Sequence, residues 1–136
     1  MNSQYHDIIN TFEQFASWED RYRFLMKAGK NLADFPDKYR TEQNLVQGCE
    51  SQVWLHIEIS NDELKCFADA DARIVKGLLF ILLTPLNGLN AKQIATFDLN
   101  GYFEQLALIK HLSPSRGNGL LSIANTIQQT AHKLSE

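Results

Sequence analysis

One stretch of two-residue periodicity constrains the fold most strongly. From Val53 to Ile59 apolar residues alternate with polar and aromatic ones, and the same alternation runs from Leu64 to Ala70. A turn-favouring pair, Asn61-Asp62, lies between the two runs. Alternation of this kind on both sides of a short turn is typical of a β-hairpin with one buried face.

Helical periodicity occurs on both sides of this hairpin. Ile8, Ile9, Phe12 and Phe15 share one helical face, and a second helix is expected after Ser17, which can cap it with Asp20 at the capping-box position. Its apolar stripe is expected to contain Trp18, Tyr22, Leu25 and Met26.

The segment 74–83 is apolar on most sides, so it is expected to be the most buried helix, with Asp71 as its cap and Thr84-Pro85 as its end. Short helices are expected after Asn90 and Asn100. Ser113-Pro114 indicates the start of a last helix, whose apolar side is Leu120, Ile123, Ala124, Ile127, Ala131 and Leu134.

These elements predict one α+β domain over residues 1–136, with the helix pairs on either side of the hairpin covering one of its faces. A chain of this length is suited to a single compact domain. Residues 41–52 show no periodicity and are expected to form an irregular connection.

Charge and composition argue against several classes of function. The formal net charge is -3 and there is no run of Lys or Arg, so a nucleic-acid or anionic-membrane partner is not expected. The longest apolar run, 78–83, is far shorter than the roughly 18 to 20 residues of a membrane span, and the first residues lack a secretory signal. We therefore expect a soluble cytoplasmic protein.

The chain has two cysteines in different settings. Cys66 lies on the same strand face as Leu64 and Ala68, which predicts a small buried core residue. Cys49 follows Gly48 in the irregular segment, where a side chain can be presented at a loop tip. Without a CxxC pair or a secretion signal, both are expected to be reduced thiols.

Nucleophilic chemistry at Cys49 would require its thiolate, which a nearby carboxylate such as Glu50 disfavours. Activation would then come from a residue distant in sequence, with Arg116 as a candidate, or from a partner protein. This fits a sulfur acceptor better than a self-sufficient hydrolase, although a cysteine hydrolase with His56 or His111 as its base stays open. The four histidines and two cysteines show no zinc-site spacing, so no metal is expected.

Four blocks of sequence resemble the SufE family of sulfur acceptors, which includes the CsdE branch. They are the segment 44–54 with Gly48-Cys49-Glu50-Ser51 at its centre, Trp18-Glu19-Asp20-Arg21-Tyr22, Asp71-Ala72-Arg73-Ile74-Val75-Lys76-Gly77, and His111-Leu112-Ser113-Pro114-Ser115-Arg116. They follow the family order and span nearly the whole chain.

The resemblance implies a fold similar to IscU-type scaffold proteins and a role as an accessory protein, not an enzyme on its own. Cys49 would carry a persulfide taken from a cysteine desulfurase of the SufS or CsdA type, which the chain would also stimulate. Gly48, Glu50, Ser51 and Arg116 would support the loop or contact the partner. The pyridoxal phosphate would belong to the desulfurase, and the chain would bind no cofactor.

The sulfur would go to an iron-sulfur scaffold or, as in the CsdE branch, to another acceptor. Glu50 stands where many SufE sequences have glutamine, and Asp69-Ala70-Asp71 lacks the usual serine, so the branch stays open. An independent sulfurtransferase and a purely regulatory adapter also stay open as functions. Two resting states of Cys49 are possible as well, a thiol tucked against apolar neighbours in a loop that swings outward, and a static exposed loop.

Overall fold

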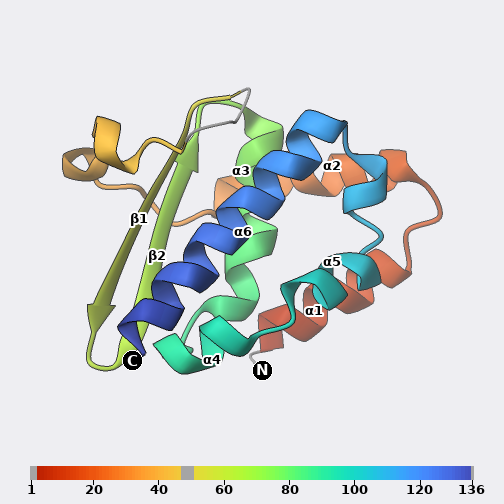
Figure 1. Cartoon of the computed structure of the whole chain (residues 1–136). Helices are drawn as coiled ribbons and strands as arrows, with labels where there is room; N and C mark the ends of the chain where they lie inside the picture. The colour runs from red at the N-terminus through yellow and green to blue at the C-terminus, as the bar shows by residue number, and fades with distance from the viewer. Residues whose placement is uncertain (1–2, 47–50, 136) are drawn as a thin grey trace.

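The computed structural model describes residues 3–46 and 51–135 and contains a two-stranded antiparallel sheet packed among helices (Figure 1). The α+β prediction is confirmed. The main helices and strands are α1 (Ser3–Glu13), α2 (Trp18–Ala28), β1 (Val53–Ser60), β2 (Glu63–Ala70), α3 (Arg73–Leu83), α4 (Ala91–Thr96), α5 (Leu99–Gln105) and α6 (Pro114–Leu134).

The hairpin forms where the alternation predicts it. Val53 pairs with Ala70 at the open end of the sheet, and Ser60 pairs with Glu63 beside the turn. Asn61 and Asp62 have φ angles of 53° and 67°, the left-handed region that asparagine and aspartate tolerate best. The inner face consists of Val53, Leu55, Ile57, Leu64, Cys66, Ala68 and Ala70.

The central element of the core is α3, in agreement with the prediction that this helix is the most buried. Its buried residues are Ile74, Gly77, Leu78, Leu79, Ile81, Leu82 and Leu83. On one side it packs against α2, where a Cβ on Gly77 would lie only 2.0 Å from the carbonyl oxygen of Leu25. Glycine at position 77 therefore allows the two helices to approach closely.

The long helix α6 runs beside the inner face of the hairpin and packs against α3 and α4 (Figure 1). Leu120, Ile123, Ala124, Ile127 and Ala131 are buried as their spacing predicts, but Leu134 is 46 % exposed in the last turn. In α2, Tyr22 is also an exception, at 43 % exposed.

Three of the predicted helix caps are confirmed. The Ser17, Asn90 and Ser113 side chains accept backbone N–H groups at the starts of α2, α4 and α6. Two predictions are wrong. Asp98, not Asn100, caps α5, and Ala72 occupies the cap position of α3 without a side-chain bond, since the Asp71 carboxylate accepts a hydrogen bond from Gln52 instead.

The two faces of the hairpin are covered by different parts of the chain, which corrects the predicted arrangement. Helices α3, α4 and α6 pack on the inner face, whereas α2 packs mainly on α3. The outer face is covered by residues 35–46, which we call the strap. The strap contains two 3-10 turns, Asp37–Tyr39 and Glu42–Asn44, and ends in a bridge between Leu45 and Trp54. Thus the described part of the predicted irregular connection, 41–46, is ordered into local turns.

No helix in the described ranges has the length and apolar character needed to cross a membrane.

Candidate functional site

The described residues on either side of the segment 47–50, which contains most of the site predicted from the sequence, lie at the open end of the hairpin. The Val46 N–H donates to the Val53 carbonyl at 2.8 Å, which ties the strap to β1. On the other side, the Gln52 N–H donates to the Asp71 carboxylate at 3.2 Å and the Asp71 N–H donates to the Gln52 carbonyl at 3.1 Å. Val46 and Gln52, on either side of the segment, are therefore anchored to the hairpin and to the approach to α3.

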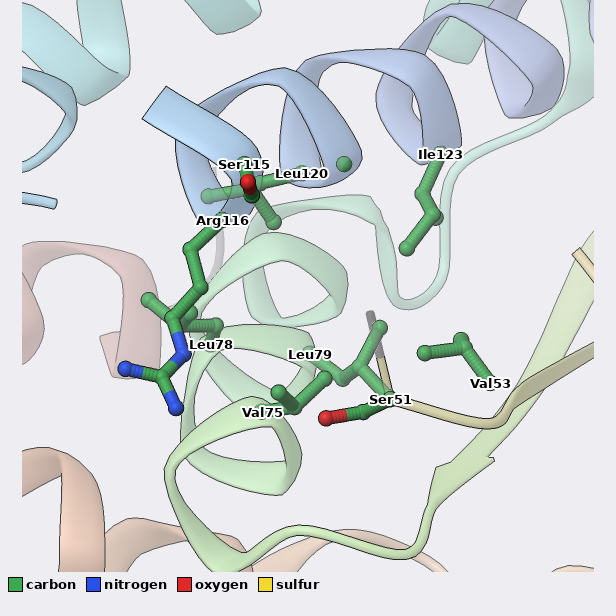
Figure 2. A pocket seen from close by; sticks show the side chains of 10 residues that line it. Ser51, Val53, Val75, Leu78, Leu79, Ser115, Arg116, Leu120 and Ile123 are labelled. Carbon is green, nitrogen blue, oxygen red and sulfur yellow. The ribbon is translucent and has the colours of Figure 1, made fainter. Parts of the chain in front are cut away.

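Ser51 and Arg116 line the same pocket, although they are far apart in the sequence (Figure 2). Its other walls are mainly apolar and come from β1, α3 and α6, namely Val53, Val75, Leu78, Leu79, Leu120 and Ile123. The cavity volume is about 30 Å³, enough for roughly one or two water-sized groups. The structure thus brings together two of the predicted site residues around a small apolar cavity.

Arg116 reaches the pocket from the first turn of α6. The Ser113 hydroxyl accepts the Arg116 backbone N–H at 3.3 Å, and Pro114 occupies the first helical position, so this turn has a defined start. The Arg116 side chain extends along α3 toward Leu78 (Figure 2). Its guanidinium forms no ion pair with any residue in the described ranges. The pocket therefore has one cationic side and no described carboxylate partner for that charge.

Three of the predicted site residues, Gly48, Cys49 and Glu50, lie outside the described residues. The other cysteine is well placed by the structure. Cys66 lies opposite Ile57 on the inner face, where burial raises the pKa of its thiol to about 12. A thiol with such a pKa is protonated at neutral pH and is a poor nucleophile. Cys66 is half-buried and packs against the core, so it is a structural residue of the inner face.

Neither histidine considered as a base lines the pocket. His56 points to the outer face of the hairpin, where its ring stacks on Tyr39 with 3.6 Å between ring centres and its Nε2 lies 3.2 Å from the Glu58 carboxylate. His111 stacks on Trp18 at 5.2 Å. Among residues 3–46 and 51–135 no group of three or more His, Cys, Asp or Glu side chains is arranged to hold a metal.

The contacts that hold the strap were not predicted from the sequence. The Arg40 guanidinium lies 5.1 Å from the ring centres of both Phe35 and Trp54 and forms an ion pair with Asp69. Lys76 adds a second contact to Asp69 at 3.4 Å. A signal was present in the hairpin itself, because its outward positions include the aromatic residues Trp54, His56 and Phe67. Aromatic residues on a face predicted to meet solvent indicate that another segment covers it.

The comparison with known families decides the classification. The family model described as SufE, Fe-S metabolism associated domain, matches residues 6–131. The chain belongs to the SufE family. Its similarity to curated members covers nearly the whole length of both proteins.

Two curated relatives and one solved structure illustrate this similarity. An uncharacterized SufE-like protein of Rhizobium meliloti (strain 1021) is 41 % identical over 128 residues, covering 91 % of each chain. The cysteine desulfuration protein SufE of Wigglesworthia glossinidia brevipalpis is 35 % identical over 129 residues, covering 94 % of this chain and 90 % of the relative. The solution structure of a hypothetical protein from Thermus thermophilus has a TM-score of 0.77, covers 97 % of this chain and 96 % of its own, and at 18 % identity supports the fold alone.

Membership in the SufE family makes the chain an accessory sulfur-transfer protein that works with a cysteine desulfurase. Within the family motif at 44–54, Ser51 and Val53 line the pocket that Arg116 also lines.

Proposed function

We propose that Cys49 accepts a sulfur atom from a pyridoxal-phosphate cysteine desulfurase, holds it as a persulfide and relays it for iron-sulfur cluster assembly. The observation that carries the proposal is the convergence of Ser51 and Arg116 on one small apolar pocket. Cys49 is two residues before Ser51, and covalent geometry limits the separation of their Cα atoms to about 7 Å. Family membership and the matching motif around Gly48 and Cys49 support the assignment.

The transfer step is an exchange between sulfur atoms. The Cys49 thiolate attacks the terminal sulfur of a persulfide on the desulfurase cysteine. A new S–S bond forms on Cys49, the S–S bond of the donor breaks, and the donor cysteine leaves as a thiolate that takes up a proton. The proton of the Cys49 thiol goes to solvent or to a base on the partner before the attack. No oxidant is needed, because the sulfur atom arrives already at the persulfide level.

Arg116 provides the charge that this step requires from the chain itself. A cation near a thiol favours the thiolate form and lowers its pKa, while the adjacent Glu50 acts in the opposite direction. The Arg116 guanidinium forms no ion pair with any described residue, so its charge is not neutralised by residues 3–46 or 51–135. We propose that Arg116 stabilises the Cys49 thiolate or persulfide and that Gly48, Glu50 and Ser51 support the loop.

The apolar walls of the pocket also support a sheltered resting state for the sulfur. An exposed thiolate is prone to oxidation to sulfenic and higher acids, and apolar surroundings reduce its contact with oxidants. In this proposal the loop between Val46 and Gln52 moves when the desulfurase binds, while the hydrogen bonds of these two residues hold its ends. Hydrogen exchange of residues 44–52 tests the proposal, and unchanged protection on binding would contradict the movement.

Mass spectrometry tests the main proposal. After incubation with a cysteine desulfurase and free cysteine, one added sulfur atom is expected on Cys49. The matched control is Cys66→Ser, which should still accept the sulfur, while Cys49→Ser should not. Sulfur on Cys66, or sulfur that persists in Cys49→Ser, would overturn the assignment. A pull-down with desulfurases of the SufS and CsdA types identifies the partner.

Stimulation of the desulfurase is a separate part of the proposal. A carrier accelerates the partner by removing its persulfide, so Cys49→Ser should lose most of the stimulation. A regulatory adapter would stimulate equally well with Ser at this position. Turnover of small substrates without any partner would indicate an independent sulfurtransferase or hydrolase.

A further inference from the structure

A groove with an excess of positive charge borders the start of α3. It consists of two adjoining hollows of about 260 and 130 Å³ that share Gly29 and Lys76. Arg40 and Asp69 line the larger hollow, and Lys30 and Arg73 line the smaller one. We call these hollows together the basic groove. Gly29 forms part of its floor, since a Cβ there would lie 2.9 Å from the Cβ of Lys76.

The charges of the basic groove are only partly neutralised. Its two carboxylates are Asp34 and Asp69, and Asp69 is already paired with both Arg40 and Lys76. Lys30 and Arg73 form no ion pair with any residue that the structure describes. Arg73 has one weak contact, a hydrogen bond of 3.5 Å to the Met26 carbonyl. In a chain of net charge -3, the basic groove is thus a local region of opposite sign.

The position of these cations is unfavourable for the helix that bears them. Arg73 and Lys76 lie in the first turn of α3, where the helix dipole is positive and an acidic side chain would be stabilising. This turn contains no acidic residue and no side-chain cap. Cations at such a position are unfavourable to the helix. The ion pair with Asp69 compensates Lys76, whereas no carboxylate among the described residues pairs with Arg73, whose charge is therefore available to an anionic ligand.

The basic groove lies directly beside the proposed sulfur site. Val75 lines the pocket of Ser51 and Arg116, while Arg73 and Lys76, in the same turn of α3, line the basic groove. Asp71, two residues before Arg73, holds the backbone of Gln52. The first turn of α3 thus lies between the pocket and the basic groove. A protein that reaches Cys49 would therefore also come close to Lys30 and Arg73.

We propose that the basic groove docks an acidic surface segment of the cysteine desulfurase. This inference rests on the proposed function, because it names the surface through which the sulfur donor is recognised. Carboxylates of the partner would pair with Lys30 and Arg73, the two cations without described ion pairs. Such pairs at the rim of an interface act mainly by steering the encounter of the two proteins.

A charge-reversal experiment tests this inference. Lys30→Glu and Arg73→Glu are combined in one variant of the full chain, and Lys92→Glu and Lys133→Glu are combined in a control. Lys92 and Lys133 are exposed residues of α4 and of the last turn of α6, at the other end of the molecule (Figure 1). Both variants change the net charge by the same amount. Arg73→Glu also places an acid in the first turn of α3, which favours folding.

The readout is the association rate constant with the desulfurase at about 50 mM and about 500 mM NaCl. At the lower salt concentration we expect the groove variant to associate about tenfold more slowly than the control, a difference that should largely disappear at the higher concentration because salt screens exposed charges. Thermal unfolding of both variants confirms that they are folded.

Each contrary outcome bears on a defined proposal. Equal association rates for the groove variant and the control, with normal sulfur transfer to the wild type, would overturn the proposal that the desulfurase docks in the basic groove and leave the proposed function intact. A difference that persists at high salt would overturn the electrostatic docking. A wild-type chain that neither binds a desulfurase nor accepts its sulfur would overturn both proposals.

Discussion

The two faces of the hairpin are stabilised by different physical effects. The inner face packs against helices through apolar side chains such as Leu55 and Leu64, which are 8 % and 3 % exposed. The outer face is covered by the strap through ring stacking and ion pairs, with Tyr39 on His56 and Arg40 on Asp69. Hydrophobic burial therefore dominates one face, and oriented polar and aromatic contacts dominate the other.

This difference bears on the functional site, because the site lies where the two faces meet. The strap leads into Val46, and the inner face leads through Val53 to the pocket. A change on the inner face should affect mainly global stability. A change on the outer face should affect mainly the attachment of the strap, with a smaller effect on global stability.

The largest effect is expected from a cavity on the inner face. Leu64→Ala removes a buried side chain of β2 and should lower the free energy of unfolding by about 3 kcal/mol, measured by urea denaturation. Ile59, its partner across the hairpin, is 49 % exposed and provides the control. Ile59→Ala should cost less than about 1 kcal/mol. Equal losses for the two variants would contradict the comparison of exposed and buried positions.

A smaller effect is expected from the main ion pair of the outer face. Arg40→Met keeps much of the apolar stem but removes the charge that pairs with Asp69, and should lower the free energy of unfolding by about 1 kcal/mol. Arg23→Met removes the solvated pairs with Glu19 and Asp20 and should have almost no effect. Urea denaturation of both variants gives the comparison, and a larger loss in Arg23→Met would contradict it.

The contribution of Asp69 should depend on pH. Partial burial by itself would raise the pKa of Asp69, but the hydrogen bonds from Arg40 and the Ala70 backbone and the charge of Lys76 outweigh it, so the pKa lies below its usual value. A carboxylate with a lowered folded-state pKa stabilises the fold above its unfolded pKa of about 4, and this stabilisation is lost as the pH falls through the folded pKa.

The difference in stability between the wild type and Arg40→Met should therefore be full at pH 6 to 7 and shrink below about pH 4. Urea midpoints over this range provide the measurement. A difference that stays constant down to about pH 2 would show that Arg40 acts through its packing on Phe35 and Trp54 and not through Asp69.

A still smaller loss is expected from Tyr39→Phe. This change removes the hydrogen bond of 3.2 Å from the Tyr39 hydroxyl to Glu58 but preserves the stack on His56. Tyr39→Ala removes both and should be the more destabilising of the two. If the two variants unfold at the same urea concentration, the ring stack contributes nothing to the attachment of the strap.

The smallest effect is expected for the reactivity of Cys66, the thiol of the inner face, toward an alkylating reagent. Burial raises the pKa of the Cys66 thiol to about 12, so the thiol is almost entirely protonated at pH 8 and alkylation of the folded chain should be very slow at this residue. Peptide mapping after iodoacetamide treatment provides the measurement. Rapid labelling of Cys66 under native conditions would contradict its burial on the inner face.

Much of the fold was predictable because its signals are local. The alternation around Asn61-Asp62, the apolar run of α3 and the caps at Ser17, Asn90 and Ser113 all depend on residues close together in the chain. Asp71 misled the prediction because its side chain bonds to Gln52, nineteen residues away, and not to its own helix. Asn100 misled it because Asp98, two residues earlier, competes for the same cap.

By itself, the sequence determined the α+β class, the hairpin with its turn at Asn61-Asp62 and the family motif around Cys49, since each follows from short patterns of residue type. Only the tertiary structure decided that Arg116 lines the pocket beside Ser51, that the strap covers the outer face, and that Lys30 and Arg73 border one groove. Those neighbours come from distant parts of the chain. Their proximity follows from the packing of α2, α3, α6 and the hairpin, and no local pattern records it.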